Sequence, residues 1–182
     1  MNMTYAGIGS RETPPEILEL MKKLAERLGQ LGFTLRSGGA KGADTAFERG
    51  ALGKHSGEIY YVDSYGCFVG FDKEMNTYKP AAINAGMELF REYHPAPYRC
   101  SDYAAKLHCR NAFILLGADL PNSPDPVDFI ICWTKDGGAT GGTGQALRIA
   151  NAYHIPVFNL FFPDAITRLG EFLKSKKIPG LK

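Results

Sequence analysis

Residues 33–44 read Phe33-Thr34-Leu35-Arg36-Ser37-Gly38-Gly39-Ala40-Lys41-Gly42-Ala43-Asp44. The apolar start predicts a short buried strand, the glycine-rich middle predicts a tight loop, and the alanine and aspartate at the end predict the first turn of a helix. A strand, a glycine loop and a helix in this order form the repeating unit of parallel α/β sheets. This stretch therefore predicts an α/β fold.

The same unit recurs on both sides of this stretch. Upstream, a strand at residues 5–8 leads to a helix for which Thr13 is the expected N-terminal cap. Further strands are predicted at residues 58–62, 127–133 and 155–160, and further helices at residues 80–93, 101–116, 144–153 and 163–174. We expect a three-layer Rossmann-like fold with a mainly parallel sheet of about five or more strands, joined by right-handed crossovers.

The chain of 182 residues is expected to form one domain over residues 1–182. Residues 63–79 show no clear period and are predicted to be a loop over one edge of the sheet. We expect an insertion or lid at about residues 63–105.

Composition narrows the classes of function. A formal net charge of +2 excludes a globally basic coat for nucleic acid but leaves room for a local basic patch. No apolar run is long enough for a membrane span, and the first residues do not resemble a signal peptide, so a cytoplasmic protein without membrane contact is expected. The four cysteines form no CxxC pair and are expected to be free thiols. His108 beside Cys109 is poor evidence for a metal, so neither a metal nor a cofactor is expected.

Three glycine-bearing loops follow buried strands and precede helices, at residues 7–11, 37–42 and 137–144. In a parallel sheet these loops share the carboxyl edge, where ligands bind. Glycine permits close approach of the backbone, and a helix start offers unpaired N–H groups to an anion such as phosphate. The candidate nucleotide-binding residues on these loops are Gly9, Ser10, Arg11, Ser37, Gly38, Gly39, Ala40, Lys41, Gly42, Thr134, Gly141, Gly142, Thr143 and Gln145.

Other phosphate motifs are missing. The first loop is not GxGxxG, and no acidic residue ends the second strand, so a dinucleotide is not expected. No P-loop motif is found.

Asp44 and Glu48 lie one turn apart on one face of the second helix, as a catalytic acid/base pair would. The alternatives are that Asp44 is only an acid at the helix N-terminus, where the helix dipole favours negative charge, and that Glu48 pairs with a nearby cation.

The three loops together resemble the SLOG superfamily of Rossmann-like nucleotide binders, which includes the DNA-processing protein A family and the Lonely-guy phosphoribohydrolases. The second loop, continued by Thr45-Ala46-Phe47-Glu48-Arg49-Gly50-Ala51-Leu52, is similar to the DNA-processing protein A form in particular. Arg110 and Asn111 resemble an Arg-Asn pair of that family, which implies that they also belong to the site.

Two functions follow from the residues and the resemblance. The first is binding of a nucleotide or nucleotide-derived ligand, with hydrolysis of an N-glycosidic bond by Asp44 or Glu48. Gln145 occupies the region where the phosphoribohydrolases carry a glutamate, which argues against their mechanism. The alternative is a module that binds single-stranded DNA without catalysis. The low net charge and the absence of flanking domains favour the first function, and a homo-oligomer is expected in either case.

Overall fold

The computed structural model of the protein describes residues 3–51, 57–64, 66, 68–70 and 78–178. Its sheet has six strands in the order β4-β3-β2-β1-β5-β6. The strands are β1 (Thr4–Gly7), β2 (Thr34–Ser37), β3 (Gly57–Val62), β4 (Phe68–Gly70), β5 (Phe129–Cys132) and β6 (Val157–Asn159). All neighbouring pairs are parallel except β3 and β4, which are antiparallel.

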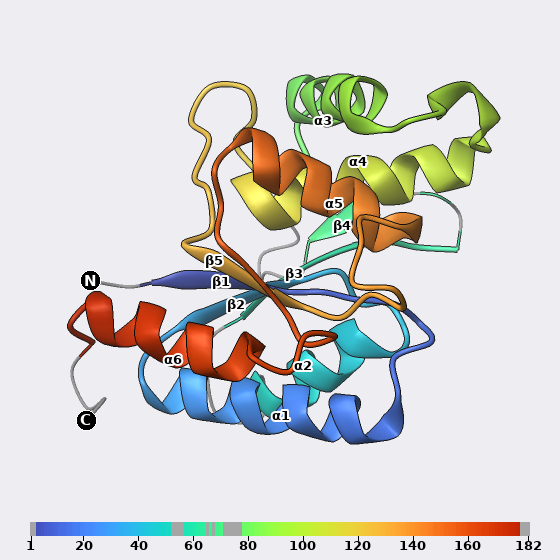
Figure 1. Cartoon of the computed structure of the whole chain (residues 1–182). Coiled ribbons are helices and arrows are strands. Elements are labelled where there is room, and N and C mark those ends of the chain that lie inside the picture. The colour runs from blue at the N-terminus through green and yellow to red at the C-terminus, as the bar shows by residue number, and fades with distance from the viewer. Residues whose placement is uncertain (1–2, 52–56, 65, 67, 71–77, 179–182) are drawn as a thin grey trace.

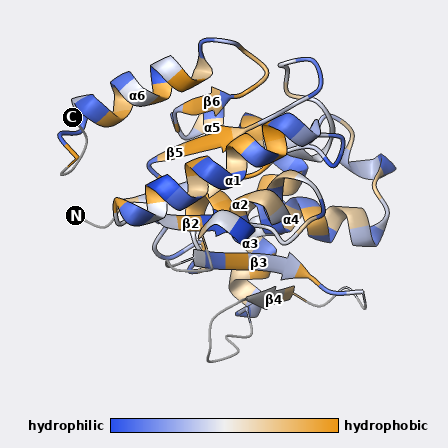
Figure 2. Ribbon diagram, turned by 90° about the horizontal axis from the view of Figure 1, so that it is seen from below, coloured by the Kyte–Doolittle hydropathy of each residue, from blue (hydrophilic) through white to orange (hydrophobic). Residues whose placement is uncertain are grey.

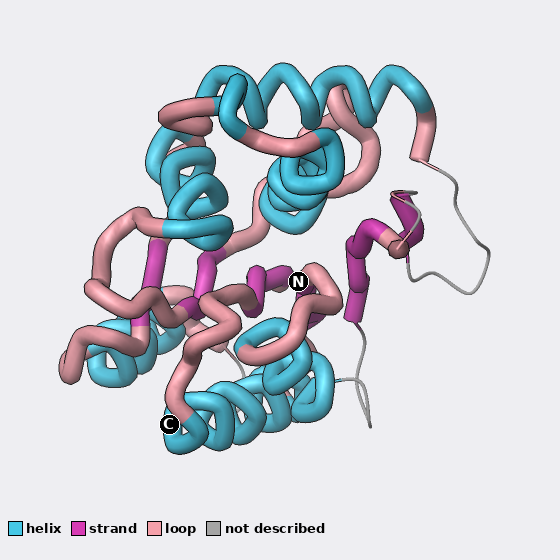
Figure 3. The backbone as a smooth tube through the Cα atoms, turned by 90° about the vertical axis from the view of Figure 1, so that its right-hand side faces the viewer, coloured by secondary structure: helices cyan, strands magenta, loops and turns pink. Residues whose placement is uncertain are grey.

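Helices cover both faces of the sheet (Figure 1). On one face lie α1 (Pro15–Gln30), α2 (Ala43–Ala51) and α6 (Ala165–Ser175). On the other lie α4 (Asp102–Leu116) and α5 (Gly141–Ala152), with α3 (Pro80–Tyr93) packed against both from outside. Figure 3 shows the strands between these two groups of helices. The three-layer Rossmann-like fold with a mainly parallel sheet is therefore confirmed.

The strands are buried on both faces, as parallel sheets require. Along β5, Phe129 and Ile131 point into the core under α1, α2 and α6, whereas Ile130 and Cys132 point into the core under α4 and α5. The ring of Phe129 stacks on Tyr5 at a centroid distance of 5.7 Å. Figure 2 shows the hydrophobic colour of β5 against the mixed surface of α1 and α6.

Two local predictions were wrong. Residues 63–79 were predicted to be a loop, but β4 pairs with β3 there, with Val62 opposite Phe68. A strand of three residues is too short to show a period of two in the sequence. The predicted cap of α1 was Thr13, but the N-cap is Pro14, without a side-chain cap. The Thr13 hydroxyl instead donates to the carbonyl of Ser10 at 2.7 Å.

The chain order of the strands reverses beside β1. From β1 the chain passes outward through β2 to β3, and it later returns to the other side of β1 as β5. The backbone N–H of Ser10 still bonds to the carbonyl of Trp133 at 3.1 Å, so the first loop and the loop after β5 leave the sheet side by side. The carboxyl ends of strands at such a reversal are where α/β sheets bind ligands.

Candidate functional site

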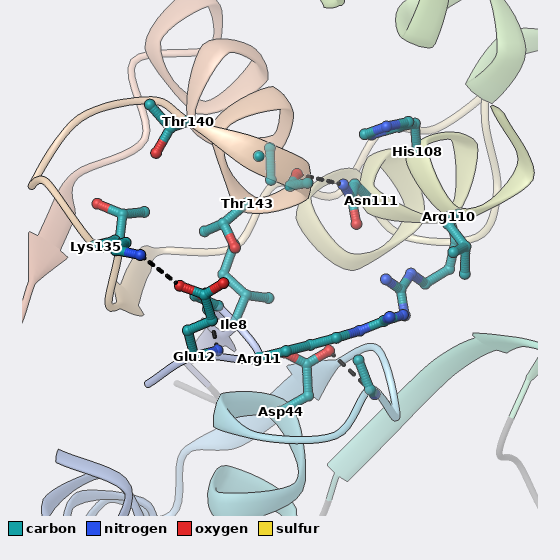
Figure 4. A pocket seen from close by; sticks show the side chains of 18 of the residues that line it. Ile8, Arg11, Glu12, Asp44, His108, Arg110, Asn111, Lys135, Thr140 and Thr143 are labelled. Atoms are coloured by element: carbon teal, nitrogen blue, oxygen red, sulfur yellow. Dashed lines mark hydrogen bonds and ion pairs between the residues drawn. The ribbon is translucent and has the colours of Figure 1, made fainter. Parts of the chain in front are cut away.

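A pocket of about 450 Å³ lies at this reversal point (Figure 4). It is lined by the first loop, the start of α2, the middle of α4, and the segment from the end of β5 into α5. Eleven of the sequence-predicted residues line it: Gly9, Ser10, Arg11, Ala40, Asp44, Arg110, Asn111, Thr134, Gly141, Gly142 and Thr143. The structure thus brings together residues from all three glycine loops and from the Arg-Asn pair.

The amino terminus of α5 forms one wall of the pocket. The helix was predicted to begin at Gly144, but it begins at Gly141, so Gly141, Gly142 and Thr143 form its first turn and line the pocket. Its N-cap residue, Thr140, makes no side-chain cap, and the Thr140 hydroxyl donates to Asp136 instead. The first N–H groups of a helix carry partial positive charge and lack intrahelical partners. This wall is therefore suited to an anion.

Gly142 leaves space at this wall. A Cβ atom added there would meet nothing within 4 Å. Any larger side chain at this position would extend into open space beside the first turn of α5. The carbonyl of Gly142 accepts a hydrogen bond from Asn111 Nδ2 at 3.2 Å, which ties the helix start to α4.

Asn111 and Gln145 form a buried amide pair behind this wall. Asn111 Nδ2 donates to Gln145 Oε1 at 3.0 Å. Gln145 was predicted to contact a ligand, but it is fully buried and is not among the residues that line the pocket. Through this hydrogen bond it contacts Asn111, which does line the pocket, while its own Nε2 has no hydrogen-bond partner among the described residues.

The second loop makes its own hydrogen bonds. The N–H of Gly39 donates to Glu48 Oε1 at 2.9 Å, and the N–H of Ala40 approaches Asp44 Oδ2 at 3.4 Å. Two carboxylates thus occupy donors that the sequence assigned to phosphate. Of the predicted residues of this loop, Ser37, Gly38, Gly39, Lys41 and Gly42 are not among the lining residues, and neither is Glu48.

A buried charge pair lies beneath this loop. Asp44 and Arg110 are 4% and 8% exposed, and the Arg110 guanidinium donates to the carbonyl of Gly38. Desolvation raises the pKa of the Asp44 carboxyl, while the charge of Arg110 and backbone N–H groups act in the opposite direction. Burial and the neighbouring Asp44 raise the pKa of Glu48 to about 7.

Exposed positive charge is found at the rim of the pocket. Arg11 and Lys135 are exposed and line the pocket, and Arg11 extends along its floor toward the side where Arg110 lies (Figure 4). Lys135 Nζ is paired with Glu12 Oε2 at 3.0 Å across the two loops. An exposed pair of this kind stabilises little, so an incoming phosphate can compete with Glu12 for Lys135.

Sequence reasoning missed several lining residues: Ile8, Glu12, Ala104, Leu107, His108, Lys135, Thr140 and Ala146. Lys135 and Thr140 lay inside a loop already assigned to the site, so their position was the available signal. His108 was considered beside Cys109 and as part of a stretch of aromatic and basic residues, but it was not named as a site residue. Burial and the charges of His94, Arg110 and Arg148 lower its pKa to about 4.

Further expectations concern thiols and membranes. Cys100, Cys109 and Cys132 are free thiols, as predicted, and Cys67 lies outside the described residues. Among the helices that the structure describes, none has the length and apolar character to cross a membrane.

Comparison with known proteins finds a matching family for the first half of the chain. A family described as DNA recombination-mediator protein A matches residues 1–95, more than half of the sequence. No curated protein matches it. Among solved structures, DNA processing protein A from Helicobacter pylori, described by its single-stranded DNA binding mode, is similar with a TM-score of 0.53 and 19% identity. The match covers 93% of this chain and 72% of that one, and at this identity it shows the fold.

Proposed function

The chain belongs to the DNA recombination-mediator protein A family, and from this premise we propose that it binds single-stranded DNA by seating a backbone phosphate at the amino terminus of α5. The solved relative from H. pylori binds single-stranded DNA, which supports this alternative over the nucleotide-binding function that the sequence favoured. One observation carries the proposal: an uncapped helix start lines a pocket at the reversal point of the sheet.

The charges at the site suit a phosphate better than a highly charged ligand. Among the lining residues, the cations are Arg11, Arg110 and Lys135 and the carboxylates are Asp44 and Glu12. Arg110 is held by Gly38 and balances Asp44, and Lys135 is shared with Glu12. Arg11 is the cation that remains available at the rim, so a single phosphodiester matches the site more closely than a triphosphate.

The positions of two exposed cations also support binding of a DNA strand. The two exposed cations Arg11 and Lys135 follow different strands of the sheet, so a chain of nucleotides can pass between them over the first turn of α5. Phosphate contacts of this kind bind without sequence preference, because phosphate carries no base information.

The proposal is tested by titrating a fluorescent oligo-dT against the protein at several salt concentrations. Single-stranded DNA that releases one counterion per phosphate contact gives a log–log slope of about −0.7 per contact. We expect a slope of about −0.7 to −1.4, from one or two contacts. Tight binding of mononucleotides with no binding of the oligonucleotide would contradict the proposal and restore the nucleotide pocket.

A second function, cleavage of an N-glycosidic bond, is favoured by one observation. Asp44 is a buried carboxylate that lines the pocket, where it could stabilise a cationic sugar. Glu48, the other predicted acid, faces Gly39 and stays with the second loop. Release of free base from nucleoside monophosphates, lost in Asp44→Asn, would establish this activity. No release across ribo- and deoxyribonucleotides would leave binding alone.

A further inference from the structure

Three metal-ligating side chains gather where α3 ends and α4 passes beneath it. His94 is the C-cap of α3, Cys100 follows the short 3₁₀ helix η1 (Pro97–Arg99), and His108 lies on α4. One ligand atom from each, two imidazole nitrogens and a thiol sulfur, lies within 4.8 Å of the others. All three side chains are partly buried, so the cluster is shielded but open to small ions.

The spacing of these atoms matches a tetrahedral metal. Zinc binds sulfur at about 2.3 Å and imidazole nitrogen at about 2.0–2.1 Å, which places a sulfur and a nitrogen ligand about 3.6 Å apart. Cys100 Sγ and His94 Nε2 are 3.7 Å apart. The rings of His94 and His108 lie with centroids 4.6 Å apart and are tilted by 57°, and their ligand nitrogens lie within 4.8 Å of each other.

We propose that His94, Cys100 and His108 bind one zinc-class transition-metal ion. Two imidazoles and one thiolate are ligands of intermediate softness, which suit zinc and cobalt and do not suit magnesium or calcium. The thiol proton of Cys100 leaves to solvent on binding, and the thiolate charge offsets the repulsion from Arg110 and Arg148, the two cations that act on His108.

Packing holds two of the ligands in place before any ion arrives. The ring of His108 stacks on Phe90 at 5.4 Å with an interplanar angle of 6°, and Phe90 also contacts the ring of His94. The turn between α3 and α4 is fixed by Arg148, whose Nε donates to the carbonyl of Tyr93 at 2.7 Å. This packing fixes the His108 ring before an ion arrives, which reduces the conformational entropy that this ligand loses on binding.

Three protein ligands leave a fourth position. His108 also lines the pocket described above, so an ion at this cluster would lie at the edge of that pocket. The fourth position is available to water or to an oxygen of a bound ligand, as in zinc sites with three protein ligands.

The neutral His94 ring must carry its proton on Nδ1 to bind a metal through Nε2. In the structure His94 Nδ1 accepts a hydrogen bond from the N–H of Ala96 at 3.1 Å. With a metal on Nε2, the neutral ring carries its proton on Nδ1, and this hydrogen bond must open. The turn at residues 94–96 therefore rearranges on metal binding, which costs some affinity and provides a spectroscopic signal at Ala96.

No metal was expected from the sequence, because His108 beside Cys109 was judged poor evidence for one. His108 and Cys109 are adjacent, but Cys109 is fully buried, and its Sγ donates to the carbonyl of Ile83 instead. The thiol that reaches His94 is Cys100, which is separated from His108 by the helix cap and nearly two turns of α4.

The test is titration of the full chain with cobalt chloride and zinc chloride. Cobalt should bind at one equivalent and give a thiolate-to-cobalt charge-transfer band, which zinc displaces. Cys100→Ser should abolish that band, and Cys100→Ser and His108→Ala should each weaken zinc binding by at least about a hundredfold. Zinc should also raise the melting temperature of the unaltered chain but not of Cys100→Ser, which reports binding even if a variant is less stable.

Two controls match the ligands by residue type. Cys109→Ala removes a neighbouring thiol and His154→Asn removes an exposed histidine whose positive φ asparagine tolerates. Both should bind zinc as the unaltered chain does. Failure of the unaltered chain to bind zinc or cobalt would overturn the proposal, and so would binding that survives both Cys100→Ser and His108→Ala.

Discussion

The backbone N–H of Gly39 donates a hydrogen bond to the Glu48 carboxylate at 2.9 Å. This contact closes the second loop onto its own helix and removes a donor that would otherwise face a ligand. Of the second loop, Ala40 still lines the pocket, beside residues of the first loop and of the start of α5. The second loop therefore contributes less to the walls of the site than the other two glycine loops.

The first prediction concerns the pH dependence of stability. The folded pKa of Glu48 is raised to about 7, above its ordinary value of 4.5, so folding favours the protonated carboxyl. Its stabilising contribution is full below pH 4.5 and is lost as the pH rises through about 7. The unfolding free energy of the unaltered chain should therefore fall between pH 5 and 8 relative to that of Glu48→Gln. Urea unfolding at four pH values measures the difference, and parallel pH profiles would contradict the assignment.

The second prediction concerns the wall of the pocket. Gly142→Val should leave the fold intact, because an added Cβ meets no atom within 4 Å, and should weaken oligo-dT binding by about tenfold or more, because the side chain occupies the place of the phosphate. The matched control is Gly170→Val on α6, where an added Cβ likewise meets nothing within 4 Å. Fluorescence anisotropy compares the three proteins. Equal affinities would remove α5 from the site.

The third prediction concerns the rim. Arg11→Ala should weaken oligo-dT binding at low salt and make the log–log salt slope shallower by about 0.7, the contribution of one phosphate contact to a single strand. Lys23→Ala on α1, an exposed lysine whose partner Glu19 lies 4.0 Å away, is the control for net charge. If both variants change the slope equally, the effect is long-range and Arg11 makes no contact.

The fourth prediction concerns the buried charges. Arg110→Met leaves the Asp44 carboxylate buried without its compensating cation and should destabilise the chain by about 3–5 kcal/mol. Asp44→Asn in the same chain removes the uncompensated charge and should restore part of this loss. Denaturant unfolding of both single variants and the double variant measures the coupling. Additive effects would show that the two groups do not interact.

Much of the fold could be predicted because its signals are local. The alternation of apolar strands with helices and the glycines after Ile8, Ser37 and Trp133 are visible in the sequence, and parallel order then follows from topology. The short strand β4 could not be predicted, since its pairing with Val62 is a tertiary contact. The start of α5 was placed too late because glycines are poor helix formers, and only packing shows that Gly141 and Gly142 lie in its first turn.

The site was predicted in part, for the same reason. Adjacent positions along one loop, such as Gly9 and Arg11, indicate a shared wall. What a side chain bonds to is not visible in this way: Glu48 accepts a hydrogen bond from Gly39, and Gln145 accepts one from Asn111. Only the folded chain brings these partners near.

The central claim is that a DNA phosphate binds at the first turn of α5. It is tested most directly by recording the backbone amide resonances of the labelled protein while oligo-dT is added. We predict that the Gly142 and Thr143 amides shift with the midpoint measured by anisotropy, while the Gly39 amide, already bonded to Glu48, stays in place. Saturating DNA binding that leaves the Gly142 and Thr143 amides unmoved would contradict the account.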